Sequence, residues 1–182
     1  MVLSWVIGTS ATLRAGELAG VTLPESVVVA GESRLLNGLG LRLATFFKVK
    51  VYVAGLYVTE KSSDAAKLLA DSSSKLVRLF FLRDVDAETL RDAFADGFEK
   101  SCRPEECQRL AASVKSFVAL QSDVKKGGTL DFELLPAEIV VKKDGKETGR
   151  IAAPGLGQVI LRIWIGENPP NAELKAGLLG TP

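Results

Sequence analysis

The sequence predicts an α+β fold in which a layer of helices covers one face of a largely antiparallel sheet. Strand-like and helix-like segments come in blocks rather than in strict alternation, and two consecutive helices carry apolar stripes that need a shared surface. A third observation is the pair Asp144-Gly145, a strong hairpin signal because both central residues of the favoured turn need positive φ. With 182 residues and 47% hydrophobic content, the chain can form one domain with a sizeable core.

Residues typical of strands dominate the first half of the chain. Two short strands are expected at 27–30 and 33–36 around a turn at Gly31, followed by longer strands at 41–47 and 49–59. The segment Gly38-Leu39-Gly40 lacks the third glycine of a dinucleotide loop and the lysine of a phosphate loop. It is interpreted as a tight turn between two strands.

Helical periodicity follows in the second half. Asp86 is expected to cap a helix that runs to about residue 100, and Pro104 suits the first turn of another helix, whose periodicity continues until Gly127-Gly128. The other predicted elements are a helix at 62–69 capped by Ser62 or Ser63, strands at 76–82, 130–134, 139–142 and 146–151, and helices at 157–165 and 171–179 with Gly180 as C-cap.

Composition and charge exclude several classes of function. Lys and Arg total 23 against 22 Asp and Glu, so no net field draws the chain to nucleic acid or to an anionic membrane. No run approaches ~18 consecutive apolar residues, which excludes an integral membrane segment. Residues 1–20 are interpreted as a poorly structured or signal-like segment ahead of a single domain at 21–182. We expect a soluble protein, in the cytoplasm or the periplasm, whose oligomeric state the sequence leaves open.

The chain contains no histidine, which removes the commonest acid/base at neutral pH and the commonest transition-metal ligand. Cys102 and Cys107 lack the four-ligand grouping of a structural zinc site and the spacing of a redox motif. Structural thiols are favoured, with a short local disulfide as the alternative in an oxidising compartment. Asp84, Asp86 and Glu88 lie at a helix start, where capping is favoured over metal binding. No metal or cofactor is expected.

Arg42 is the sharpest candidate for a functional residue. A guanidinium between two leucines on a strand either faces water or is held by a partner, because burying it unpaired costs several kcal/mol. Tyr52 and Tyr57 differ by an odd number of positions and should point to opposite faces, so only one of them can share a pocket with Arg42. Lys48 and Lys50 have the parity of Tyr52 and are interpreted as solvated or edge charges.

Four separated segments resemble the chalcone isomerase superfamily, particularly its bacterial chalcone isomerase-like branch. The matching segments, in chain order, are Asn-Gly-Leu-Gly-Leu-Arg, Lys-Val-Tyr-Val-Ala-Gly-Leu-Tyr-Val-Thr-Glu-Lys-Ser, Leu-Arg-Asp-Val-Asp-Ala-Glu-Thr-Leu and Leu-Arg-Ile-Trp-Ile-Gly-Glu-Asn-Pro. The resemblance implies an open-faced β-sandwich, a curved antiparallel sheet backed by a layer of helices, with a cleft between the two layers.

The resemblance also implies site residues. Arg42 matches the arginine that orients the substrate in the plant isomerases, whereas Tyr52, Thr89 and Asp96 stand where those enzymes have a threonine, a tyrosine and an asparagine. In the fatty-acid-binding relatives, an arginine and a tyrosine are thought to hold a carboxylate, and Arg42 and Tyr52 match this pair. The tail would then lie against helix stripes that include Phe94, Phe98, Phe117 and Leu161.

Two functions follow from the resemblance. The favoured one is non-catalytic binding of a fatty acid or a similar amphiphilic carboxylate in an apolar cleft. The alternative is an isomerase, an intramolecular lyase that acts on a chalcone or another enone through Arg42, where a cation would stabilise the developing enolate charge.

Overall fold

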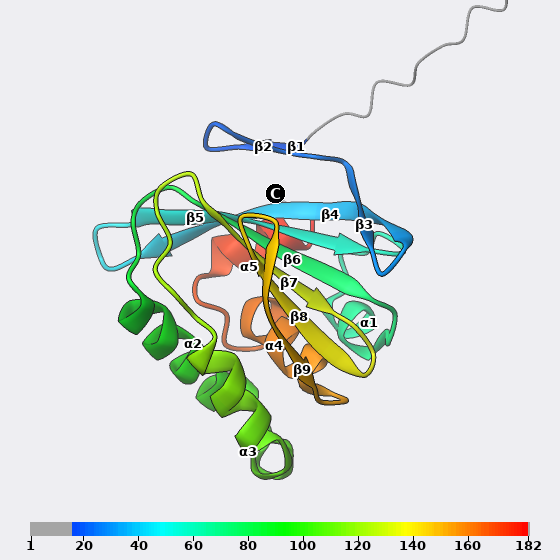
Figure 1. Cartoon of the computed structure of the whole chain (residues 1–182). Helices are drawn as coiled ribbons and strands as arrows, with labels where there is room; N and C mark the ends of the chain where they lie inside the picture. Colours follow the sequence, from blue (N-terminus) through cyan, green and yellow to red (C-terminus); the bar gives the residue numbers. More distant parts are fainter. Residues whose placement is uncertain (1–15, 182) are drawn as a thin grey trace, which may run out of the picture.

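A seven-stranded antiparallel sheet forms the frame of the molecule (Figure 1). The computed structural model describes residues 16–181, and its sheet has the order β3-β4-β5-β6-β7-β8-β9, so that neighbours in the chain are also neighbours in the sheet. The strands are β3 (Ser26–Val29), β4 (Glu32–Ala44), β5 (Val49–Val58), β6 (Lys75–Phe81), β7 (Thr129–Leu134), β8 (Glu138–Lys143) and β9 (Lys146–Ala152).

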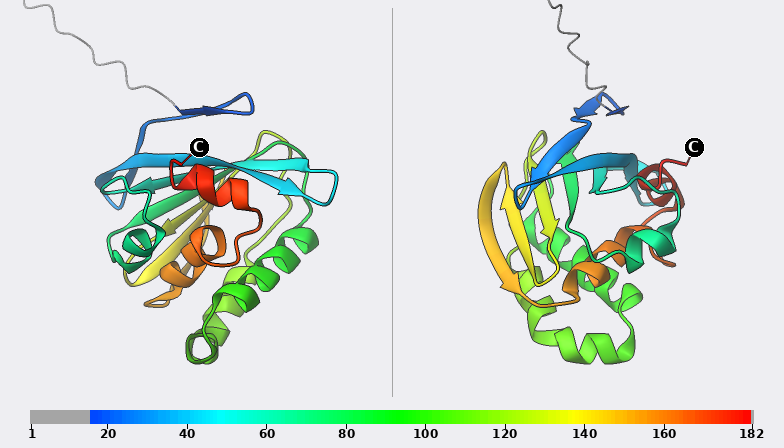
Figure 2. Two further views of the ribbon diagram at one scale, coloured as in Figure 1. Left: turned by 180° about the vertical axis from the view of Figure 1, so that it is seen from behind. Right: turned by 90° about the vertical axis from the view of Figure 1, so that its right-hand side faces the viewer.

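The helices lie in the hollow of the curled sheet, and a small hairpin lies on its outer side (Figure 2). The hairpin consists of β1 (Gly16–Leu18) and β2 (Val21–Leu23), which pair antiparallel. The helices are α1 (Ala65–Ala70), α2 (Ala87–Ser101), α3 (Pro104–Ala119), α4 (Leu156–Ile165) and α5 (Ala172–Leu178). This arrangement confirms the predicted α+β class and the curved antiparallel sheet backed by helices.

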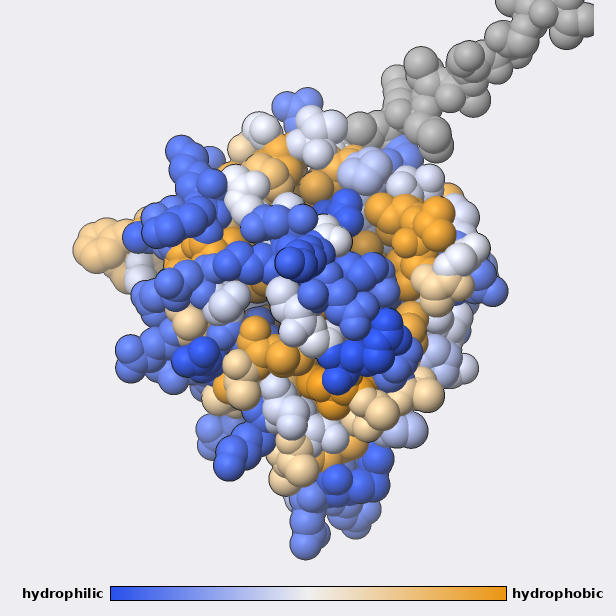
Figure 3. All heavy atoms as spheres, in the orientation of Figure 1, coloured by the Kyte–Doolittle hydropathy of each residue, from blue (hydrophilic) through white to orange (hydrophobic). Residues whose placement is uncertain are grey.

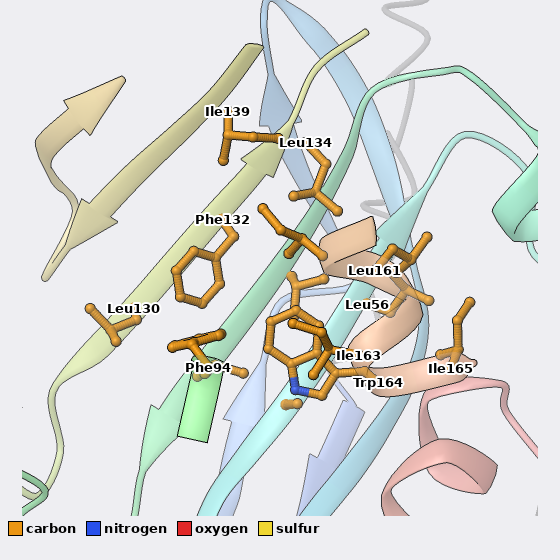
Figure 4. Packing of buried hydrophobic residues seen from close by; sticks show 14 of the residues in the cluster. Leu56, Phe94, Leu130, Phe132, Leu134, Ile139, Leu161, Ile163, Trp164 and Ile165 are labelled. Carbon is orange, nitrogen blue, oxygen red and sulfur yellow. The ribbon is translucent and has the colours of Figure 1, made fainter. Parts of the chain in front are cut away.

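The main core lies between the sheet and α4, the most apolar helix. Eight of the ten residues of α4 are buried, and Figure 4 shows Trp164 and Leu161 pointing from this helix toward the strands. On β5, Tyr52 belongs to this core, whereas Tyr57 packs on the outer side with Val29 and Leu36. The prediction that the two tyrosines face opposite sides is therefore confirmed.

The tight turn predicted at Gly38-Leu39-Gly40 is wrong, because both glycines lie inside the 13-residue strand β4. Their role is close approach of two backbones. A Cβ on Gly38 would lie 2.1 Å from the Gly177 carbonyl oxygen, and one on Gly40 would lie 2.2 Å from that of Leu174. Gly177 on α5 meets β4 in the same way, so helix and strand pack with no side chain between them.

Several element boundaries differ from the sequence prediction. The strand expected to reach residue 47 ends at Ala44, α3 ends at Ala119 rather than near residue 127, and the cap of α1 is Asp64, whose carboxylate accepts from Ala66 N–H at 2.8 Å. Residues 16–20, expected to belong to a poorly structured segment, form β1 and the turn that follows. The rest of the segment 1–20 lies outside the described residues.

Candidate functional site

A cavity of about 320 Å³ lies between the sheet and α2, near the end of β4 and the start of β5. This volume is at the lower end of the range typical of small-molecule sites. Most of its wall is apolar, and the polar groups come chiefly from the two strands and from the rim of α2. The lining residues are Arg42, Ala44, Val51, Tyr52, Leu79, Val85, Thr89, Leu90, Ala93, Phe94, Asp96, Gly97, Lys100, Ile163, Trp164, Asn168, Pro169 and Pro170.

Arg42 projects into this cavity from β4, half-buried, on the same face as Gly38 and Gly40. Its guanidinium donates to two backbone carbonyl oxygens, those of Leu43 and, at 3.2 Å, Pro170. No Asp or Glu of the described part of the chain forms an ion pair with it. The wall of an apolar cavity therefore holds a cation whose charge only carbonyl dipoles offset.

Tyr52 lies directly opposite Arg42 on the neighbouring strand, so the two side chains share one face of the sheet. The phenol is 9% exposed, and its oxygen accepts a hydrogen bond from the indole N–H of Trp164 at 3.1 Å. Burial raises the pKa of the Tyr52 hydroxyl, while the Trp164 hydrogen bond and the charge of Arg42 act in the opposite direction. The hydroxyl therefore stays protonated at neutral pH and can donate to a ligand.

A β-bulge at Val51 determines which side chains of β5 reach the cavity. Arg42 pairs with Tyr52 but Leu43 pairs with Lys50, which leaves Val51 as an extra residue that lines the cavity beside Tyr52. Lys50 consequently lies opposite Leu43, on the face that points away from the cavity. The parity that the sequence suggested for Lys50 and Tyr52 is wrong because a bulge shifts the period of the strand by one residue.

Comparison with known proteins places this geometry in a family. A family model described as chalcone isomerase-like matches residues 15–180, nearly the whole chain. The chain belongs to the chalcone isomerase-like family. Among solved structures, a fatty-acid binding protein of Arabidopsis thaliana resembles it with a TM-score of 0.67 and 20% sequence identity, over 88% of this chain and 92% of that chain. A search of curated proteins found no match.

All four site residues that the sequence predicts for this chalcone isomerase-like chain line the same cavity, but they lie in two different settings. Arg42 and Tyr52 form part of the inner wall, whereas Thr89 and Asp96 are exposed on the rim of α2. The Thr89 hydroxyl donates to Asp86 at 3.1 Å, and Asp96 pairs with Lys100 at 2.7 Å. These two rim residues already have partners on their own helix.

The expected contacts for an apolar tail are only partly correct. Phe94 lines the cavity, but Phe98, Phe117 and Leu161 belong to the packed core instead. The apolar stripes of α2 and α4 are wider than the cavity that they border, and no residue of α3, which carries Phe117, lines it. The sequence argument missed Trp164, which packs edge to face on Phe94 with ring centroids 6.0 Å apart. The available signal was an indole N–H, a donor that needs a partner, within a largely apolar helix.

The remaining chemical candidates lie outside this cavity. Cys102 and Cys107 are joined as a disulfide at the junction of α2 and α3, with Cα atoms 5.5 Å apart. The sequence favoured free structural thiols, and the structure instead contains the short local disulfide that was the alternative. Asp86 caps α2 by accepting from Thr89 N–H at 2.7 Å, as predicted. Residues 16–181 contain no cluster of three potential metal ligands. Within the same residues, no helix is both long and apolar enough to span a bilayer.

Proposed function

We propose that this chalcone isomerase-like protein binds a medium-chain fatty acid or a similar amphiphilic carboxylate without catalysing a reaction. The observation that carries the proposal is Arg42, a half-buried guanidinium in the cavity wall that contacts two carbonyl oxygens and, among the described residues, no carboxylate. An anionic head group would supply the missing counter-charge. A guanidinium binds a carboxylate through two parallel hydrogen bonds, which fixes the orientation of the ligand.

Tyr52 supports the same assignment. Its oxygen already accepts from Trp164, so its own proton is the group that remains for a ligand, and its raised pKa keeps that proton in place. A neutral donor beside Arg42 strengthens the binding of one carboxylate without adding a second charge that must lose its hydration.

The cavity also suggests the length of the ligand. A methylene group is similar in size to a water molecule, whose share of liquid volume is about 30 Å³. A cavity of about 320 Å³ therefore holds roughly ten non-hydrogen atoms, so an acid of about eight carbons, with its two oxygens, should fill it and a slightly longer chain should reach its opening. Val51, Leu79, Leu90, Phe94 and Ile163 would contact the chain. The fold shared with a solved fatty-acid binding protein is consistent with this use of the cavity.

Calorimetric titration with decanoate tests the proposal. Arg42→Ala should weaken binding roughly ten- to a hundredfold, because a charge-assisted bond to a buried group contributes ~1.5 to 3 kcal/mol. Tyr52→Phe removes a neutral donor and should cost about 0.5 to 1.5 kcal/mol. Affinity should rise by up to ~0.8 kcal/mol per methylene until the cavity is full.

Two controls make the test specific. Arg83→Ala removes an exposed arginine of the same charge and should leave binding unchanged. Methyl decanoate, which lacks the anionic head group, should bind worse than decanoate to the wild type and should lose little further affinity in Arg42→Ala. If acid and ester bind alike, or if Arg42→Ala has no effect, Arg42 is not a carboxylate site and the proposal is wrong.

A further inference from the structure

The turn between β4 and β5 carries the most exposed aromatic surface of the described residues. Phe46 and Phe47 are 94% and 84% exposed, and their rings pack edge to face with centroids 5.9 Å apart. Figure 3 shows the resulting pale orange knob at the left of the molecule, where Figure 1 places this turn. Within residues 16–181, the other exposed large hydrophobic residues are Val28 and Leu35, on β3 and the first part of β4.

The backbone of the turn holds both rings outward. Lys48 N–H donates to Thr45 C=O at 3.1 Å and closes a tight loop, and both of these residues adopt positive φ, 62° for Thr45 and 50° for Lys48. A β-branched residue in this region of φ is strained, and such strain is concentrated at functional sites. The turn is thus a compact tip that presents two phenylalanine rings and has no apolar surface of its own to cover them.

This tip is adjacent to the cavity. Arg42 and Ala44, which precede it on β4, both line the cavity, and Ala44 is only two residues from Phe46. Pro169 and Pro170 line the same end of the cavity, and Arg42 donates to the carbonyl of Pro170. A surface that covers the two rings would therefore lie beside the cavity lining.

The charges around the tip are mostly positive. Lys48 is 73% exposed on its side chain and Lys50 is exposed on the face away from the cavity. Glu173 lies 3.6 Å from Lys48 and offsets part of this charge, but both groups are well exposed and such pairs are weak. Two aromatic rings flanked by lysines are the combination that inserts into the interfacial layer of an anionic bilayer.

The size of the apolar tip favours a lipid surface over a protein. Two aromatic side chains bury about 300 to 500 Å² together, whereas a specific protein interface needs about 1,000 Å². A bilayer requires no complementary pocket to accept a protruding tip. We propose that the β4–β5 turn inserts Phe46 and Phe47 into an anionic lipid surface and so holds the cavity beside the membrane, from which it takes up or to which it delivers its ligand. The docking surface itself is independent of the ligand, but the delivery role rests on the proposed function.

Co-sedimentation with vesicles tests this inference, using phosphatidylcholine alone and phosphatidylcholine with about one third phosphatidylglycerol. The wild type should bind the anionic vesicles, and the double variant Phe46→Ser/Phe47→Ser should bind them at least about tenfold more weakly. Lys50→Gln should reduce binding to the anionic vesicles roughly fivefold and leave binding to the neutral ones unchanged. Val28→Ser, which removes an exposed hydrophobic residue elsewhere on the sheet, is the matched control and should bind like the wild type.

Decanoate titration without vesicles separates this inference from the proposed function. The double variant should keep the wild-type affinity for decanoate in water, because neither phenylalanine lines the cavity. A wild type that binds decanoate but no vesicle, or a double variant that still sediments with anionic vesicles, would overturn the docking proposal and leave the ligand site intact.

Discussion

Single residues on β5 mark a cavity side and an outer side of the sheet. Tyr52 faces the cavity, whereas Tyr57 lies on the outer side, where its hydroxyl donates to Pro24 C=O at 3.0 Å. Burial raises the pKa of Tyr57 to about 12, Arg78 lowers it, and Asp131 and Glu25 raise it further. The two phenols thus share a strand and a protonation state, but only one is available to a ligand.

The raised pKa of Tyr57 predicts a loss of stability at alkaline pH. Its value in the unfolded chain is about 10, so between pH 10 and about 12 the unfolded state releases a proton that the folded state retains, and the free energy of unfolding falls. The slope should be less than about 1.4 kcal/mol per pH unit, because the folded and unfolded states differ by less than one bound proton at any pH in this range. Urea unfolding from pH 8 to 12 measures it, and Tyr57→Phe should show a shallower slope above pH 10. Equal slopes for both proteins would refute this assignment.

Three positions that correspond to active-site residues of the plant isomerases, but carry other residues here, predict that the protein lacks chalcone isomerase activity. Tyr52, Thr89 and Asp96 replace the threonine, tyrosine and asparagine of the plant enzymes, and orientation of the reacting groups can contribute as much as ~7 to 11 kcal/mol. We expect no measurable acceleration of the closure of naringenin chalcone over buffer. The decay of chalcone absorbance is the measurement. A rate proportional to protein concentration that vanishes in Arg42→Ala would establish the isomerase alternative instead.

At the scale of elements, the contact between β4 and α5 positions the site. Asn171, which precedes α5, donates to Leu41 C=O at 3.1 Å and accepts from Leu43 N–H at 3.2 Å, so its amide holds the backbone on both sides of Arg42. Asn37 forms the other end of this contact, where it donates to Leu178 C=O at 2.7 Å. Between the two asparagines, the glycines let helix and strand touch.

Asn171→Ala should therefore reduce ligand affinity although Asn171 does not line the cavity. Its loss leaves two backbone groups without their partner, and each such group costs ~1 to 3 kcal/mol if it stays buried. Urea unfolding and decanoate titration of the same variant measure the two effects. Asn37→Ala is the matched control, which should lose stability to a similar degree and keep its affinity. Equal losses of affinity in both variants would mean that α5 supports the cavity as a whole and does not position Arg42 in particular.

The extent of prediction from the sequence also differs from element to element. Period-2 and period-3.6 patterns are local properties, so the strands of the seven-stranded sheet, the helices and the hairpin at Asp144-Gly145 were predictable, whereas the short strands β1 and β2 were missed. The placement of Arg42 and one tyrosine in a common cavity followed from strand parity and the resemblance. Gly38 and Gly40 were misinterpreted because a turn and a close backbone approach select the same residue. The bulge at Val51 and the partner of Trp164 depend on contacts distant in sequence.

At the scale of the whole molecule, the site and the disulfide lie at different parts of α2. Thr89, Asp96 and Gly97 border the cavity, whereas Cys102 follows the end of the helix and joins Cys107 in the first turns of α3. The disulfide closes a loop of only a few residues, so its effect should be confined to the packing of α2 against α3.

The double variant Cys102→Ser/Cys107→Ser should consequently lose stability but not affinity. Closing so short a loop constrains the unfolded chain by about 2 kcal/mol, which is the expected decrease in the free energy of unfolding. Urea unfolding and decanoate titration are again the measurements, with the wild type treated with a reducing agent as the comparison. A variant that kept its stability and lost its affinity would place the disulfide in the binding site.

The bulge at Val51 determines which charged side chains face the cavity. In a regular ladder, Val51 would pair with Leu43, and Lys50 would then lie opposite Ala44 with its ammonium group directed into the cavity beside Arg42. One unpaired residue instead turns an aliphatic side chain inward and the ammonium outward. Inserting a residue after Arg42 would restore the regular period and bring Lys50 to the inner face. The selectivity for a single anionic group that the proposed function requires would thus depend on strand register as well as on the identity of the lining residues.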